Sequence, residues 1–284
     1  MSQLFRQESA FRSPEGQPGG SSLAELFHEN TKNHRPIHFP NTSEDTYTVK
    51  ELDAMTRAYK QYRRRPRVAL PEVQSCPAES FDDIIRARRT NRKFGSGELA
   101  LAELSALMQW SYGISAEAVI TGGGVQRLRA APSAGALYPA EIYLGVRSVG
   151  GLDAGIYHYE VPDHTAALLS HGDASERLQA VCCGQEYARE AAVVVLIAGV
   201  IERTRRKYGN RGYRYVLLDV GHLAQNLCLA ATVLGLSITT TCGFFDDEAA
   251  DLIGIDGCDE AVLYVAFVGK PSCTEISCHR QPRD

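Results

Sequence analysis

From residue 80 onward, apolar positions along the chain follow two regular patterns. Apolar residues at helical spacing, and short amphipathic stretches, predict helices over 81–89, 101–112, 174–183, 215–236 and 246–252. Short apolar or β-branched runs predict strands over 141–146, 156–159, 192–200, 237–241 and 261–268. Strands separated by helices predict an α/β or α+β sandwich with a mixed sheet.

The segment 215–236 gives the clearest helical signal. Val216, Val220, Leu223 and Leu227 recur at steps of three and four. Gly235 stands where a glycine commonly ends a helix. We therefore expect a long helix with one buried face.

The first 79 residues differ from the rest of the chain. Residues 1–20 are rich in Ser, Gly, Pro and Gln, which predicts a disordered N-terminus. Residues 21–79 are interpreted as an arm with a helix near 48–63 and a basic linker at 63–67, followed by a main domain at 80–272 and a C-terminal tail at 273–284. The basic run could bind nucleic acid, but a solvated linker is favoured because it is isolated in an acidic protein.

Composition limits the possible functions. The 284 residues include 30 Lys+Arg and 34 Asp+Glu, a net charge of −4 that argues against a nucleic-acid partner. The longest uncharged apolar run, 191–201, is far shorter than the roughly 20 residues that span a bilayer, so we expect no membrane partner. No secretory signal is evident at the N-terminus, so we expect a cytoplasmic protein whose 8 cysteines are thiols.

Several common catalytic and binding motifs are missing. The chain has no P-loop, no H-E-x-x-H and no G-x-S-x-G. His34 and His38 are four residues apart, but Pro36 disrupts a helical metal-binding face. We therefore predict no metal site.

A first candidate site lies at the end of the helix predicted over 81–89. Arg88, Arg89 and Arg92 surround the hydroxyl of Thr90. Guanidinium groups and a hydroxyl supply the charge and the forked donors that a phosphate monoester needs. The alternative is a solvated basic helix end.

A second candidate is the loop from Ala131 to Pro139. Small residues between Pro132 and Pro139 predict a rigid loop whose backbone can approach a flat ligand closely. The alternative is an ordinary tight turn before the next strand.

A third candidate precedes the long helix. Lys207 and Tyr208 are adjacent and can serve one pocket only if the backbone is irregular, which Gly209 and Gly212 permit. A Lys with a lowered pKa can act as a base, with Tyr as its proton partner. The alternative is a surface loop with extended side chains.

In this order, these segments resemble the nitroreductase superfamily, and within it the SagB-type azoline dehydrogenases. The resemblance covers about residues 80–270 and is carried by R-R-T-N-R, P-S-A-G-A-L-Y-P, G-I-Y-H-Y, K-Y-G-N-R-G-Y-R-Y, D-V-G-H-L-A-Q-N, T-T-T-C-G-F-F and V-G-K-P. It implies an α+β three-layer sandwich around a central mixed, mainly antiparallel sheet. It also implies an intertwined homodimer with FMN at the subunit interface.

The resemblance also implies roles for individual residues. Lys207 and Tyr208 would be the catalytic pair, which removes a substrate proton while hydride passes to the flavin. The cofactor-binding residues would be Arg88, Arg89, Thr90 and Arg92 near the phosphate, Pro132, Ser133, Ala134, Gly135 and Ala136 from the partner subunit, Thr241, Cys242 and Gly243 along the flavin edge, and Lys270 at the phosphate.

One departure from many nitroreductases fits the dehydrogenase branch. Ala136 and Tyr138 stand where those enzymes have Asn and Gln. The implied function is oxidation of a thiazoline, oxazoline or related heterocycle, carried by a peptide or carrier protein, with O₂ reoxidising the flavin and any cyclase or carrier being a separate protein. Two alternatives are an NAD(P)H-dependent nitro or quinone reductase and a non-catalytic subunit that kept the fold.

Overall fold

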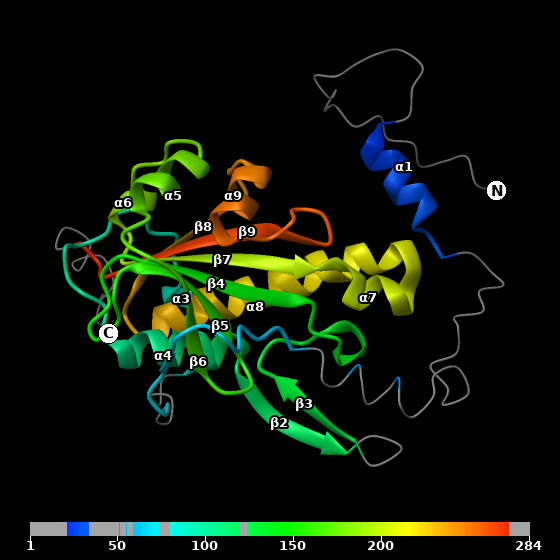
Figure 1. Ribbon diagram of the computed structural model, residues 1–284, viewed down its shortest axis with the longest axis horizontal. Coiled ribbons are helices and arrows are strands. Elements are labelled where there is room, and N and C mark those ends of the chain that lie inside the picture. Colours follow the sequence, from blue (N-terminus) through cyan, green and yellow to red (C-terminus); the bar gives the residue numbers. More distant parts are fainter. Residues whose placement is uncertain are drawn as a thin grey trace. The chain divides into compact units, whose positions relative to one another are not determined.

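A computed structural model describes residues 22–33, 51, 55, 59–73, 80–119 and 124–272 (Figure 1). The predictions for residues 1–20 and 273–284 lie outside these ranges, as does most of the helix predicted near 48–63. Residues 59–62 are not helical, so that helix does not reach residue 63. The chain divides into two units, 1–38 and 39–284.

The first unit contains helix α1 (Leu23–Asn30). The Ser22 side chain accepts a hydrogen bond from the Glu25 N–H, and the Glu25 side chain accepts one from the Ser22 N–H. This reciprocal pair satisfies two donors that a helix start otherwise leaves open. The sequence pattern did not predict this short helix.

The second unit is built on a seven-stranded sheet with the order β1-β6-β5-β4-β7-β9-β8. The strands are β1 (Arg67–Ala69), β4 (Ala140–Val146), β5 (Gly155–Glu160), β6 (Thr165–His171), β7 (Val193–Val200), β8 (Ser237–Thr241) and β9 (Glu260–Gly269). Every neighbouring pair in this sheet is antiparallel. The predicted α+β class is confirmed, and the sheet, expected to be mixed and mainly antiparallel, is antiparallel in every neighbouring pair.

Helices cover both faces of this sheet, as Figure 1 shows. Helices α4 (Leu101–Tyr112) and α8 (Gly212–Val233) pack into one core, with α3 (Phe81–Ala87) beside α8. Helices α5 (Ser175–Val181), α6 (Tyr187–Glu190) and α9 (Asp246–Ile253) form the other core. Coverage of both faces explains why β4 is buried along its whole length.

Helix α8 is the long helix that the sequence predicts, displaced by three residues at each end. Val216, Leu223 and Leu227 are fully buried, and Gly235 adopts φ 65° just beyond the helix end. The span Ile201–Val233 is long and apolar enough to cross a membrane by length and composition alone. The buried face of α8 in the core accounts for this apolar character.

Several elements carry weak sequence signals and were not predicted. Strands β2 (Ile114–Val119) and β3 (Val125–Arg129) pair with each other outside the large sheet. Their residues are largely exposed or half-buried, so no apolar run marks them. Helix α7 (Ile201–Tyr208) is rich in charge and has Thr204 as its buried residue.

Part of the predicted arm lies on the sheet. Strand β1 pairs with β6, and Arg67 forms an ion pair of 2.7 Å with the buried Glu160. The Tyr62 N–H donates to Glu160 at 2.6 Å, and Lys60 forms an ion pair with Glu260. Strand β1 therefore extends the edge of the sheet, while Lys60 contacts Glu260 of the distant strand β9.

Candidate active site

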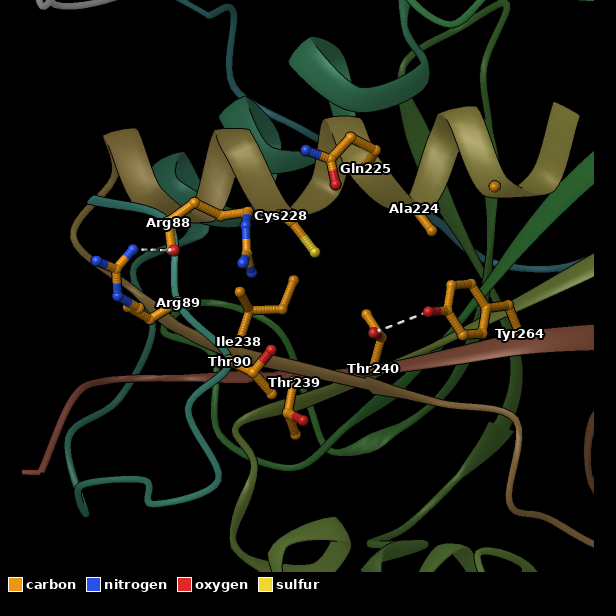
Figure 2. Close-up of a pocket in the computed structure, with 11 residues that line it drawn as sticks. Arg88, Arg89, Thr90, Ala224, Gln225, Cys228, Ile238, Thr239, Thr240 and Tyr264 are labelled. Atoms are coloured by element: carbon orange, nitrogen blue, oxygen red, sulfur yellow. Dashed lines mark hydrogen bonds between the residues drawn. The ribbon is translucent and has the colours of Figure 1, made fainter. Parts of the chain in front are cut away.

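A pocket of about 230 Å³ opens between the end of α3, helix α8 and strand β8 (Figure 2). Three of the predicted phosphate-binding residues line it. The full lining is Arg88, Arg89, Thr90, Gly221, Ala224, Gln225, Cys228, Ile238, Thr239, Thr240 and Tyr264. The sequence analysis identified the arginines and Thr90 and missed the residues from α8, β8 and β9.

The early end of α3 brings Arg88 to this pocket. Arg88 is the C-cap residue and has an extended conformation (ψ 121°). The helix therefore ends at residue 87, whereas the prediction extended it to residue 89. The Asn91 N–H then donates to the Ile238 carbonyl at 2.8 Å, which attaches the segment to β8. Arg89 donates back to the Arg86 and Arg88 carbonyls, as Figure 2 shows for the latter. Arg88 and Thr90 are thus the better placed donors for an anion.

The helix side of the pocket is made of small residues. A Cβ added at Gly221 would meet no atom within 4 Å, and Ala224 lies one turn further along α8. On the strand side, the Tyr264 hydroxyl donates to Thr240 Oγ1 at 3.0 Å. The pocket therefore combines a flat, open helix face with hydroxyl groups and a cationic end.

The remaining predicted phosphate residues lie outside the pocket lining. Lys270 forms a salt bridge with Glu103 at 2.6 Å, and Arg92 is exposed beside Tyr187. Burial raises the pKa of Tyr187 against the opposing charge of Arg92. A phosphate role for Lys270 and Arg92 stays a prediction.

The predicted flavin-edge segment follows β8 directly. Thr241 Oγ1 accepts a hydrogen bond from the Gly243 N–H at 2.9 Å, and Cys242 is exposed. This tight turn leaves the chain next to the strand that lines the pocket. A flavin contact by residues 241–243 stays a prediction.

The predicted flat-ligand loop is held in an unusual backbone conformation. It contains the short helix η1 (Ala134–Ala136), and Gly135, Ala136 and Tyr138 have φ values of 62°, 53° and 45°. Positive φ is unfavourable for Ala and Tyr, and such residues cluster at functional sites where the surroundings enforce them.

Hydrogen bonds to Asp219 of α8 hold this loop. The Ser133 hydroxyl donates to Asp219 Oδ2 at 2.5 Å, and the Ala134 N–H approaches Asp219 Oδ1 at 3.4 Å. Ser133 Oγ also accepts from the Tyr138 N–H at 2.8 Å. Burial raises the pKa of Asp219, while its bond to Ser133 opposes that rise.

Lys207 and Tyr208 meet this loop within one chain. They are the last two residues of α7, and Gly209 breaks the helix with φ 58° and ψ −147°. A Cβ added at Gly135 would lie 2.6 Å from Tyr208 Oη and 3.0 Å from Lys207 Nζ. The absence of a side chain at Gly135 thus allows both functional groups to converge on one point, and the break at Gly209 matches the backbone irregularity expected there.

Helix α8 joins the two parts of the site. It begins at Gly212, four residues after Tyr208, and carries Gly221 and Cys228 in the pocket. At 1.5 Å per residue, these lie about 14 and about 24 Å along the helix from its first residue. Helix α8 thus connects the pocket to the region of Lys207 and Tyr208.

A buried charge cluster lies behind the loop, and the sequence analysis did not identify it. Arg203 Nη1 lies 2.6 Å from Glu141 Oε1 and donates to the Tyr138 carbonyl at 3.1 Å. His158 Nε2 lies 2.8 Å from Glu141 Oε2. Burial acts to raise the pKa of Glu141, but Arg203 and His158 lower it to about 2. The one signal in the sequence was Glu141, an acidic residue at the start of the otherwise apolar strand predicted over 141–146.

Comparison with known proteins gives related sequences of two kinds. The chain is 36% identical over 188 residues to MJ1384 of Methanocaldococcus jannaschii, named a nitroreductase, covering 66% of this chain and 89% of that protein. It is 26% identical over 216 residues to the trifolitoxin-processing protein TfxB of Rhizobium leguminosarum bv. trifolii. It is 34% identical over 154 residues to the microcin B17-processing protein McbC of Escherichia coli. These matches cover 74% and 49% of this chain, but only 58% of TfxB and 53% of McbC.

Solved structures agree with the fold. A nitroreductase from Anabaena variabilis superposes with a TM-score of 0.62 at 30% identity, covering 73% of this chain and 42% of that one. A chain of the E. coli microcin synthetase McbBCD complex superposes with a TM-score of 0.55 at 21% identity, covering 88% of this chain and 92% of that one. The relatives TfxB and McbC support the predicted resemblance to the SagB-type branch. Because the model of the nitroreductase family matches residues 85–270, the chain belongs to that family of oxidoreductases.

Proposed function

We propose that the protein is an FMN-dependent oxidoreductase of natural-product biosynthesis, which oxidises a thiazoline, oxazoline or related heterocycle to the aromatic azole. The observation that carries this proposal is the convergence of Lys207 Nζ and Tyr208 Oη on Gly135. A base and a hydroxyl at one point suit removal of a C–H proton. TfxB and McbC, by their names, process peptide toxins, which supports a substrate carried on a peptide.

The pocket residues fit FMN. The Arg88 guanidinium and the Thr90 hydroxyl supply charge-assisted donors for a phosphate. Gly221 and Ala224 leave space for a flat ring against α8, and Gln225 and Thr240 can serve its polar edge. When bound, FMN would supply the two-electron acceptor for the substrate oxidation, with O₂ as the final oxidant.

The chain's own residues supply orientation and proton transfer. Lys207 is the base that takes the acidic C–H proton of the heterocycle, and the Tyr208 hydroxyl orients the substrate nitrogen. The substrate thus loses one hydride and one proton, two hydrogens in all, and O₂ becomes H₂O₂. The loop at Gly135 closes one side of the site and keeps water from the base.

A homodimer would complete the site. The pocket of about 230 Å³ is smaller than the roughly 300–1,000 Å³ typical of ligand pockets. Leu217 and Leu218 are 43% and 56% exposed on α8, next to Gly221. We propose that a second copy covers this face. Leu218→Lys should give a monomer with low flavin content by light scattering and absorbance, whereas Val119→Lys, at an exposed strand end, should not; a dimeric Leu218→Lys variant would argue against this interface.

The direct test begins with a visible absorbance scan of the purified protein. We expect a flavin spectrum that NADPH does not bleach under anaerobic conditions and that an azoline peptide does bleach. In air, the azole product should be two hydrogens lighter, with one H₂O₂ formed per turnover. Rapid bleaching by NADPH alone would favour a reductase instead, and a colourless protein that FMN cannot reconstitute would contradict both activities.

A further inference from the structure

Helix α7 makes two contacts with the loop, one turn apart. Arg203 and Lys207 are four residues apart and share a helix face. Arg203 donates to the Tyr138 carbonyl at 3.1 Å, while Lys207 Nζ lies beside Gly135. The two cationic residues thus contact opposite ends of the positive-φ segment 135–138.

The Arg203 contact is anchored deep in the sheet. Glu141 on β4 is 4% exposed and holds Arg203 at 2.6 Å through one carboxylate oxygen. His158 on β5 is fully buried and holds the other oxygen at 2.8 Å. Two neighbouring strands therefore fix the position of the Arg203 guanidinium, and with it the start of α7.

We propose that Arg203 is a positioning residue, which aligns the Lys207–Tyr208 pair with the Gly135 loop through its ion pair to Glu141 and its hydrogen bond to the Tyr138 carbonyl. This inference rests on the proposed function, because it assigns Lys207 and Tyr208 to catalysis. We call the Glu141–Arg203–Tyr138 contact the clasp.

The clasp makes two distinct contacts. Its hydrogen bond limits the motion of the Tyr138 peptide, which supports the unfavourable φ of Ala136 and Tyr138. Its carboxylate pairs with the Arg203 guanidinium, which lies one turn of α7 before Lys207. The charged groups around the cluster are Arg129 on β3, Asp219 on α8 and Lys207 on α7, besides Arg203 and His158.

The test compares two buried ion pairs in the same sheet. The double variant Glu141→Gln/Arg203→Met removes both charges of the clasp, so that neither partner is left buried without the other. The matched control is Arg67→Met/Glu160→Gln, whose carboxylate is also buried but lies away from the loop. We expect the clasp variant to lower kcat about 10–100-fold with little change in KM or flavin content, because a displacement of about 1 Å has effects of this size. The control should keep kcat.

A double-mutant cycle separates positioning from general destabilisation. If Arg203 acts through Lys207, then Arg203→Met should lower the single-turnover rate in the wild-type background but not in the Lys207→Ala background. Arg203→Lys, which keeps the charge, should recover part of the rate. Equal losses in both backgrounds would overturn the proposal.

A measurement without turnover separates this proposal from the proposed function. In the flavin-loaded protein, amide hydrogen exchange over residues 133–138 should accelerate about tenfold or more in the clasp variant and remain unchanged in the control. If wild-type protein turned over no azoline, the proposed function would fail while this measurement still tested the clasp. Unchanged exchange at 133–138 would overturn the clasp itself.

Discussion

The two ends of helix α8 are built in opposite ways. The open pocket lies at the Cys228 end. Its arginines follow the end of the short helix α3, and a Cβ added at Gly221 would meet no atom within 4 Å. At the Gly212 end, three residues of the loop adopt positive φ values, and Asp219 and Arg203 hold it by hydrogen bonds. The end proposed to receive a ligand thus keeps room and donors, whereas the end proposed to place reactive groups is fixed by its own contacts.

Because of this difference, we expect substitutions at one end to change the affinity for the cofactor and substitutions at the other end to change the rate of turnover. Changes at the Arg88 end should alter cofactor affinity, and changes at the Gly135 end should alter turnover in a protein that still binds flavin. The following tests are ordered from the largest expected effect to the smallest.

The catalytic pair should give the largest effect. We expect Lys207→Ala/Tyr208→Phe to lower kcat about 10²–10⁴-fold, because general acid–base catalysis contributes factors of this size. Flavin absorbance should be retained. Arg206→Ala, on the exposed side of the same helix, is the control for the lost charge. Normal oxidation by the double variant would remove these residues from the mechanism.

The phosphate end should affect affinity alone. Arg88→Ala removes a charge-assisted contact of about 1.5–3 kcal/mol, so the Kd for FMN should rise about 10–150-fold. Arg86→Ala is a matched control on the same helix, where the exposed arginine pairs with Asp82. Kd is read from fluorescence titration of the apoprotein. Equal flavin occupancy in both variants would contradict the phosphate role of Arg88.

Gly135 offers a test at the fixed end. Gly135→Ala adds a Cβ at 2.6 Å from Tyr208 Oη and should lower kcat about 10–100-fold. Gly235→Ala has almost the same backbone angle, φ 65° against 62°, and meets nothing within 4 Å. Both variants should lose about 1–2 kcal/mol of stability in chemical denaturation. A loss of kcat in Gly235→Ala as well would mean that the strain, rather than the contact, sets the rate.

The free energy of unfolding at acid pH should show the smallest effect. Glu141 has an ordinary pKa of 4.5 that the fold lowers to about 2. A lowered carboxyl pKa stabilises the fold above the unfolded value, so this contribution is lost as pH falls from 4.5 toward 2. We expect the free energy of unfolding to fall less steeply over this range in Glu141→Gln than in wild type. Glu176→Gln, at an exposed ion pair, should keep the wild-type slope.

The sequence predicted most elements that bury uniform apolar residues, although strand β6, whose residues 166–168 are buried, was missed. Helix α8 and strands β7 and β9 have uniform apolar runs or spacing, and the structure confirms them near their predicted limits. Helix α7 was missed because it is rich in charge, and the β2–β3 pair was missed because its residues are largely exposed or half-buried. Strand β1 has only three residues and is defined by its partner β6.

The candidate site was predictable where residue type alone indicates chemistry. Arg88, Thr90, Lys207 and Tyr208 were selected from local motifs. Asp219, Glu141 and Arg203 were not, because each acts through a contact made only in three dimensions. The exact use of Gly135 also required the structure, since its role is to leave space for side chains more than 70 positions later.

The edge strand β1 has a consequence for the order of folding. Arg67 pairs with Ala167, so three ladder positions must close a loop of 100 residues. Antiparallel neighbours β5 and β6 are joined by a short turn and form at a much smaller entropic cost. We therefore expect β1 to dock last, onto a sheet that is already assembled, and to detach first. Pulse-labelling of the β1 amides during refolding should then show protection only in the final step, when β1 pairs with β6.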